Sequence, residues 1–365
     1  MQECYLPTGN EWVSLPTLQA RTGALESFSF LHMGYKGLIE QRGGASLPLM
    51  TPFFETEGER ASLQSLTWGR KSDWIPTFCG TAGSLAVEGM LLAPVGERGF
   101  LYQLTVRSTS DKPLSSTFGL EGCWASAWHC VNEDKEIDGA RRCYTSLWND
   151  SLIFDMRCGL PLFAFAPMMD QPCSSTFQET DAGIVYRLAH DCTLEPGQAV
   201  TVTFYWGVGF EEVAAATSAK EMLRQGWQHE LQVTTDWLDA RRWPIPDAQL
   251  ERLYNTNLFF CLFYSAGITL DTEELVLVTS RSPRYYVSAA YWDRDSLLWS
   301  FPTVVDADPA LARRMLDYVF GRQRRNLGVH SRYIDGTVLE PGFELDELMA
   351  PVLALERYAA ATGDR

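Results

Sequence analysis

Several features that mark whole classes of protein are missing from this sequence. No apolar stretch approaches the roughly 20 residues that a helix needs to cross a bilayer. The first residues, Met1-Gln2-Glu3-Cys4, contain no basic segment followed by an apolar run, so no secretion signal is predicted. We therefore expect a cytoplasmic protein that does not span a membrane.

Positive charge is also scarce. The chain has 30 Lys and Arg against 46 Asp and Glu, which gives a formal net charge of -16. Nucleic acids and anionic membrane surfaces are polyanions, so a protein of this charge would be repelled by both. Neither is expected as a partner.

The nine cysteines do not form a recognisable metal or disulfide pattern. None of them stands in a Cys-x-x-Cys pair. Cys123 and Cys130 flank His129, but no second pair of ligands at zinc spacing follows. Reduced and mostly buried thiols are the expected state in the cytoplasm. We predict neither a metal site nor a cofactor.

The first two thirds of the chain have the pattern of β-structure. Strand-like apolar runs are separated by clusters of Gly, Pro, Asn, Asp and Ser. The clearest runs cover residues 100–106, 152–156, 162–165 and 200–206. Many strands at short spacing predict an antiparallel, supersandwich-like β-sandwich as an N-terminal domain over residues 1–210. With 365 residues, the chain is long enough for a second domain.

The pattern becomes helical near residue 210. We predict a connecting helix within a linker over residues 211–244, followed by a helical domain over 245–365. Asp247 stands at the N-cap position of the first helix of that domain. Further helices are predicted from about Asp295, over residues 309–320 with Asp308 as N-cap, and over 345–361. Residues 328–342 are predicted to form a loop.

The segment from Tyr291 to Trp299 contains the first group of residues suited to chemistry. Asp293 and Asp295 flank Arg294, and Tyr291 and Trp292 precede them. Carboxylates and Arg can bond vicinal sugar hydroxyls, and aromatic faces pack on a pyranose. The alternative is a helix start in which Asp295 is a cap or first-turn acid and Arg294 forms a salt bridge. Composition alone leaves both interpretations open.

A second group lies between residues 328 and 348. His330 and Arg332 are followed by Glu340, Glu344, Asp346 and Glu347. Anionic side chains are favoured at helix N-termini, which accounts for one or two of these acids. Crowded carboxylates also raise one another's pKa, which keeps a general acid protonated near neutral pH. Hydrolysis of a glycosidic bond requires such an acid and a second carboxylate.

Together these two segments resemble the six-hairpin, helical-toroid glycosidases. This group includes glucoamylases, trehalases, N-glycan-trimming α-glucosidases, bacterial exo-α-mannosidases and amylo-α-1,6-glucosidases. The matching residues are Trp292-x-Arg294-Asp295 and an acidic pair, Asp346-Glu347, whose helix ends at Thr362-Gly363-Asp364. The resemblance implies a β-sandwich, a helical linker and an (α/α)6 barrel.

The resemblance also implies roles for individual residues. Arg294 and Asp295 would hold the sugar in subsite -1, and Asp346 would be the general acid, with Glu344 as the second choice. Glu347 would contact the sugar. The remaining expected substrate contacts are Tyr291, Trp292, Asp293, His330 and Arg332.

One departure from this group concerns the barrel. A complete toroid has six helical hairpins, whereas only about four helices are predicted after residue 245. The group's general base lies late in the barrel, so we expect a truncated barrel that lacks the base and is inactive alone. The predicted function is an inverting, exo-acting glycoside hydrolase for an α-linked glucoside or mannoside. The alternatives are a glycoside phosphorylase on the same fold and a non-catalytic carbohydrate-binding protein.

Overall fold

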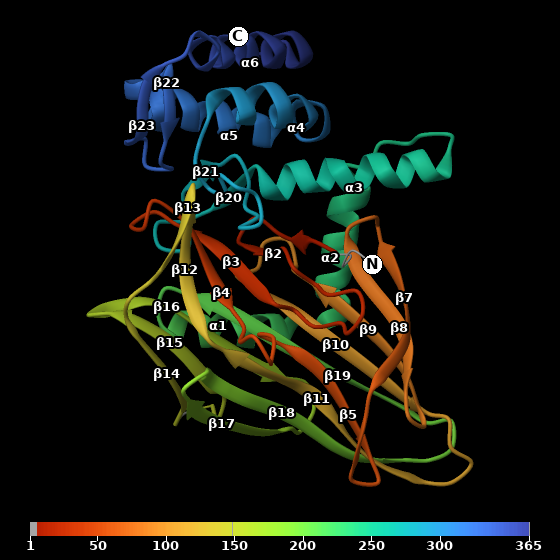
Figure 1. The fold of residues 1–365 in the computed structure, drawn as a ribbon. Helices are drawn as coiled ribbons and strands as arrows, with labels where there is room; N and C mark the ends of the chain where they lie inside the picture. The colour runs from red at the N-terminus through yellow and green to blue at the C-terminus, as the bar shows by residue number, and fades with distance from the viewer. Residues whose placement is uncertain (1–5, 148, 365) are drawn as a thin grey trace.

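The computed structural model describes residues 6–147 and 149–364 of the chain. Strands fill the sequence up to Gly209, and helices dominate after it. Figure 1 shows the strands stacked as layers, with helices α3 to α6 gathered at one end of the stack. The prediction of an antiparallel sandwich followed by helices is confirmed.

The largest sheet has eight strands, and its pairings are all antiparallel. The four strand-like runs of the sequence all lie in this sheet, where β-branched and aromatic residues form its interior. Its strands, in spatial order, are β14 (Ala140–Thr145), β15 (Leu152–Cys158), β16 (Leu160–Met169), β19 (Ala199–Gly209), β10 (Gly99–Ser108), β9 (Leu85–Leu92), β8 (Ile75–Ala82) and β7 (Leu63–Lys71).

Two smaller antiparallel sheets pack with it around a common apolar core. Aromatic rings form the middle of this core: Phe154 stacks on Phe165 at 4.7 Å, and Trp124 meets Phe165 edge-on at 5.0 Å. One sheet contains β1 (Thr8–Gly9), β2 (Val13–Leu15), β3 (Ser27–His32), β4 (Gly37–Arg42), β12 (Ser126–Val131) and β13 (Glu133–Glu136); the other contains β17 (Ser174–Thr180), β18 (Gly183–Leu194), β11 (Leu114–Trp124), β5 (Thr51–Thr56) and β6 (Glu59–Ala61).

The linker consists of two helices, whereas a single helix was predicted. Helix α1 (Glu212–Gln225) ends at Gly226, whose φ of 84° is open to glycine but strained for other residues, and α2 (Trp227–Asp239) follows directly. Helix α1 lies close against β16 and β19. A Cβ atom at Gly207 would lie 2.1 Å from the carbonyl oxygen of Ala215, so this approach requires glycine.

A second apolar core joins the sandwich to the helices. Trp74, in the turn between β7 and β8, stacks on Phe263 of α3 (Ala248–Tyr264) with 5.5 Å between ring centroids. Asp247 caps α3 and Asp308 caps α5 (Pro309–Tyr318), as predicted, because each carboxylate accepts backbone N–H groups of the first turn. The sandwich and the helical region are therefore packed on each other.

The helical region contains two short hairpins in addition to its helices. The prediction of a loop over residues 328–342 is wrong, because β22 (Val329–Arg332) pairs there with β23 (Val338–Phe343). Gly336, with φ of 85°, supplies the turn residue of this hairpin. The other elements are β20 (Ala266–Ile268), β21 (Leu275–Leu277), the π-helical turn η1 (Asp295–Ser300), α4 (Phe301–Ala307), the turns η2 (Val319–Gln323) and η3 (Arg324–Asn326), and α6 (Leu345–Thr362).

None of the described helices is both long and apolar enough to cross a lipid bilayer.

Candidate functional site

The two segments singled out in the sequence meet in space. Tyr291 donates its backbone N–H to the carbonyl of Arg332 at 2.9 Å, and Arg332 returns the bond at 3.0 Å. This bridge places the start of η1 beside the β22–β23 hairpin, and the hairpin runs directly into α6. All ten predicted site residues gather here: Tyr291, Trp292, Asp293, Arg294, Asp295, His330, Arg332, Glu344, Asp346 and Glu347.

The inner layer of this cluster is a fully buried polar network. The Tyr291 hydroxyl donates to Asp293 Oδ1 at 2.5 Å, and the Arg332 guanidinium bonds the other Asp293 oxygen. The same guanidinium lies 5.0 Å from the centre of the Tyr291 ring. Burial raises the pKa of the Asp293 carboxyl, while Arg332 opposes that shift. These three residues are fully buried and join the start of η1 to the β22–β23 hairpin.

Glu347 is the carboxyl that links α6 to the start of η1. Its Oε2 accepts the backbone N–H groups of Asp293 at 2.6 Å and Arg294 at 3.3 Å. Its Oε1 makes no hydrogen bond to any residue that the structure describes. The side chain is fully buried, and this burial raises its pKa to about 7. Glu347 therefore titrates near neutral pH.

Arg294 organises the outer layer. Its guanidinium donates to Asp346 Oδ2 at 2.9 Å and to Glu344 Oε2 at 3.2 Å, and lies 3.4 Å from Asp295 Oδ2. The Asp346 side chain is 49% exposed, and the hydrogen bond from Arg294 lowers its pKa. Burial raises the pKa of Asp295. One cation thus connects the predicted general acid with the predicted sugar contact.

His330 forms the side of the cluster next to the sandwich. Its Nδ1 lies 2.6 Å from Glu344 Oε1, its Nε2 lies 3.4 Å from Glu340 Oε2, and Trp292 meets its ring edge-on at 5.7 Å. Asn132, which follows β12, donates to Glu340 at 3.2 Å. The sandwich therefore contributes to the site through Asn132, which belongs to no recognisable sequence motif.

A pocket of about 420 Å³ opens beside Asp295. Asp295 Oδ2, turned toward Arg294, makes no hydrogen bond within the described part of the chain. Trp299 is 61% exposed at the pocket. Among the lining residues that sequence reasoning missed are Thr279, Ser280, Ser282, Arg284 and Tyr285, from the irregular stretch before η1. Their proximity depends on the path of that stretch, for which the residues give no periodic signal.

One group of potential metal ligands lies at β4, β12 and β13. Donor atoms of Glu40, Cys130 and Asp134 lie within 4.8 Å of one another. Arg42 donates to Glu40 Oε2 at 2.5 Å and also bonds Asp134, while Arg284 donates to Glu40 Oε1 at 2.8 Å. The carboxylates are already neutralised by arginines, so we assign no metal to this group.

The fold resembles that of two solved carbohydrate-active enzymes. No protein-family profile and no curated protein sequence matches the chain. A chain described as a kojibiose phosphorylase from the human microbiome superimposes with a TM-score of 0.59 and 11% identity, over 97% of this chain and 53% of that one. A bacterial glucoamylase complexed with acarbose superimposes with a TM-score of 0.52 and 10% identity, over 99% of this chain and 57% of that one.

The chain thus spans little more than half the length of either solved protein. The predicted resemblance to six-hairpin glycosidases is confirmed at the level of the fold alone. The roles of the individual site residues stay predictions.

Proposed function

We propose that this chain binds the terminal sugar of a glycoside in the pocket beside Asp295 and protonates the glycosidic oxygen from Asp346. The observation that carries the proposal is the Arg294 guanidinium, which contacts both carboxylates, at 2.9 Å from Asp346 and 3.4 Å from Asp295. A sugar held by Asp295 would have its neighbouring bond close to Asp346.

The pocket has the composition that sugar binding needs. Its volume of about 420 Å³ lies near the lower end of the range for small-molecule sites. Trp299 and Tyr285 offer aromatic surface for the apolar face of a pyranose, and Asp295 lines the same pocket. These groups support recognition of one sugar unit and an exo mode of action.

Two neighbouring carboxyls, Asp346 and Glu347, each have one of the two properties that a general acid needs. Asp346 is exposed enough to reach a substrate, but Arg294 favours its ionised form. Glu347 has the higher pKa, but it is fully buried. A sugar whose hydroxyls accept from Arg294 would withdraw that guanidinium from Asp346 and thereby raise the pKa of Asp346. Substrate binding would then prepare the acid, with Glu347 positioning the backbone of Asp293 and Arg294.

The favoured reaction is inverting hydrolysis of an α-linked glucoside or mannoside, to which these residues contribute the general acid but not the general base. Phosphorolysis is the second candidate, since one solved structure of similar fold is described as a phosphorylase and another as a glucoamylase. In both reactions the leaving group takes its proton from the acid. The same residues therefore serve either proposal.

Sugar binding is the first test. Glucose, mannose and acarbose would be titrated into the full chain, with fluorotryptophan NMR following Trp299, whose signal is assigned with Trp299→Phe. We expect a saturable shift that Asp295→Asn weakens roughly tenfold, as loss of a charge-assisted hydrogen bond does. Asp317→Asn, an exposed aspartate of α5, is the matched control. Binding that Asp295→Asn leaves unchanged would instead support sugar recognition by the sandwich.

Cleavage is the second test. Aryl α-glucosides and α-mannosides would be incubated with the chain, with and without inorganic phosphate. Turnover that Asp346→Asn abolishes supports the acid assignment, and dependence on phosphate selects phosphorolysis. Turnover that Asp346→Asn leaves unchanged rejects Asp346 as the acid.

A further inference from the structure

An open hollow of about 710 Å³ lies along the outer face of α5, away from the candidate site. Its walls come from the β20–β21 turn, α5, the turns η2 and η3, and the β22–β23 turn. The ten residues of the candidate site, all of them described, lie outside this lining. We call it the arginine hollow, because Arg314, Arg322 and Arg325 line it.

The segment that forms most of this hollow has the opposite charge to the protein as a whole. Residues 313–325 contain five arginines and a single aspartate, so their formal charge is +4 in a chain whose net charge is -16. The three arginines of the lining are exposed, so a dissolved ligand can reach them. A local excess of one charge favours ligands of the opposite sign.

The hollow also contains three carboxylates, but each has a cation beside it. The three ion pairs are Arg322 with Glu274, Lys36 with Asp335 at 3.0 Å, and Arg313 with Asp317 at 3.8 Å. Their charges are therefore balanced before any ligand binds. Carboxylate oxygens that are partly exposed can still accept hydrogen bonds from hydroxyl groups.

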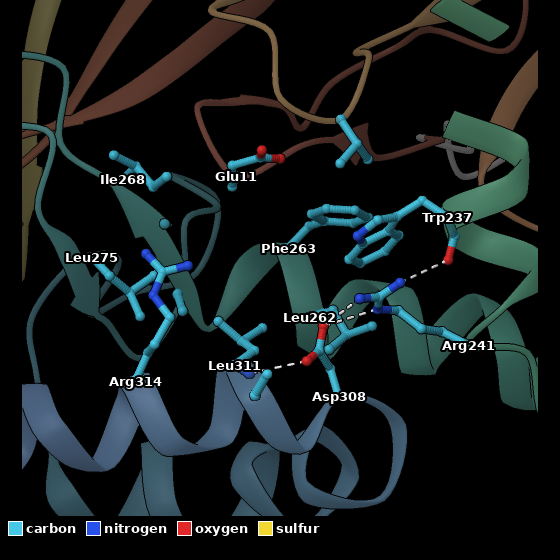
Figure 2. Close-up of a pocket in the computed structure, with 14 residues that line it drawn as sticks. Glu11, Trp237, Arg241, Leu262, Phe263, Ile268, Leu275, Asp308, Leu311 and Arg314 are labelled. Atoms are coloured by element: carbon cyan, nitrogen blue, oxygen red, sulfur yellow. Dashed lines mark hydrogen bonds and ion pairs between the residues drawn. The ribbon is translucent and has the colours of Figure 1, made fainter. Parts of the chain in front are cut away.

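Arg314 and Arg325 are the two arginines of the hollow that these pairs do not use. Within the described chain, neither forms a hydrogen bond, or an ion pair closer than 4.0 Å. Figure 2 shows Arg314 extending from α5 beside Leu275, which also lines the hollow. Burial raises the pKa of Glu11 and the charge of Arg314 opposes that shift, but the two side chains lie beyond ion-pair distance. Two guanidiniums thus remain free to bind a ligand.

Gly321 keeps the surface between these two arginines open. It lies seven residues after Arg314 and four before Arg325, a spacing at which helical residues share one face. Beyond its chain neighbours and its own helix backbone, a Cβ atom added to Gly321 would meet no atom of the described chain within 4 Å. Eleven helical residues span roughly 16 Å, which two long side chains with a phosphate between them can bridge.

We propose that the arginine hollow binds a phosphorylated sugar. A phosphate monoester carries a charge near -2 and three acceptor oxygens, which match the two free guanidiniums, and guanidinium forms bidentate bonds with phosphate. The volume of the hollow exceeds what phosphate alone requires and lies within the range of small-molecule sites. The paired carboxylates accept the hydroxyls of the sugar. A neutral sugar would leave Arg314 and Arg325 unpaired.

Isothermal titration calorimetry on the full chain at low ionic strength tests the proposal, with glucose 6-phosphate, inorganic phosphate and glucose as probes. We expect one glucose 6-phosphate to bind per chain, more tightly than inorganic phosphate, and more weakly as salt is added. Arg314→Gln and Arg325→Gln should each weaken this binding roughly tenfold, because each removes charge-assisted hydrogen bonds. Both positions are exposed, so the variants should fold, which circular dichroism verifies.

Two controls separate this site from general charge effects and from the proposed function. Arg324→Gln removes the same charge from the same turn η3 but lies outside the lining, and Asp295→Asn alters the other pocket. Both should bind glucose 6-phosphate as the wild type does. The proposal is overturned if glucose 6-phosphate does not bind, if inorganic phosphate binds equally well, or if Arg324→Gln weakens binding as much as Arg314→Gln. Loss of binding in Asp295→Asn alone would place the ligand in the other pocket and also reject this site.

Discussion

The sandwich and the helical region bury different kinds of side chain. The sandwich interior is built from stacked rings, such as Phe154 on Phe165. Below the candidate site, the helical region instead encloses Asp293 and Arg332 as a pair in which neither member is exposed. Glu347 is equally buried. The stabilisation from buried apolar side chains does not change with pH, whereas the stabilisation from buried ionisable side chains does. The stability of the helical region should therefore be the more sensitive to pH.

Buried carboxylates of the sandwich illustrate the contrast. Glu40 is bonded by Arg42 and Arg284, and Asp155 by Arg142 and Arg157, and each of these arginines is partly exposed. The charges of these arginines remain in contact with water. The pair beneath the site has no such contact, so its stability depends on geometry alone.

The largest expected effect is that of Arg332→Met. It leaves Asp293 buried without its cation, which should cost about 3–5 kcal/mol of unfolding free energy. Urea unfolding followed by tryptophan fluorescence measures the loss. Arg325→Met removes an exposed arginine of η3 as the matched control. Equal losses in the two variants would contradict a role for the buried pair.

Glu347→Gln tests the pH sensitivity directly. The pKa of Glu347 is about 7 in the folded chain against an ordinary value of 4.5. Between these values the folded protein retains a proton that the unfolded chain has released. The contribution of Glu347 to the unfolding free energy is therefore greatest below pH 4.5 and decreases as the pH rises to about 7, by at most about 3 kcal/mol.

The variant should lack this decline, so it gains stability over the wild type as pH rises from 4.5 to 7. Unfolding curves collected across that range measure the difference. Glu356→Gln, an exposed glutamate of the same helix, shows what loss of a charge from α6 does by itself. Parallel pH profiles for wild type and Glu347→Gln would refute the assignment.

Arg281→Met should uncouple the two regions. This fully buried arginine donates to the carbonyls of Asn10 in the sandwich and Phe263 in α3, at 2.5 and 2.9 Å. Burial lowers its pKa to about 10. Loss of these bonds should cost about 2 kcal/mol. Calorimetry should then resolve two transitions, whereas a single sharp transition would show that the apolar core suffices for coupling.

The sequence predicted those parts of the molecule that local patterns determine. Strands such as 200–206 and the capped helix after Asp308 follow from periodicity and from a single capping side chain. That Arg294 and Asp346 belong to one site was expected only through a family resemblance, and the hydrogen bond between them was not predicted. The pocket lining at Thr279 depends on long-range contacts of an irregular segment, for which local residue patterns carry no signal.

Substitutions of exposed apolar residues should have the smallest effect on the unfolding free energy but a clear effect on solubility. Leu160 is an exposed apolar side chain of strand β16 in the sandwich, whereas Leu345, Met349 and Val352 are exposed along one face of α6. An exposed apolar stripe favours association.

Val352→Lys should change the unfolding free energy by no more than about 0.5 kcal/mol. It should reduce binding of a hydrophobic dye and self-association in sedimentation velocity. Leu160→Lys makes the same type of change at a single exposed apolar residue of the sandwich and should alter neither. If both variants reduce dye binding equally, the contrast between the two surfaces does not hold.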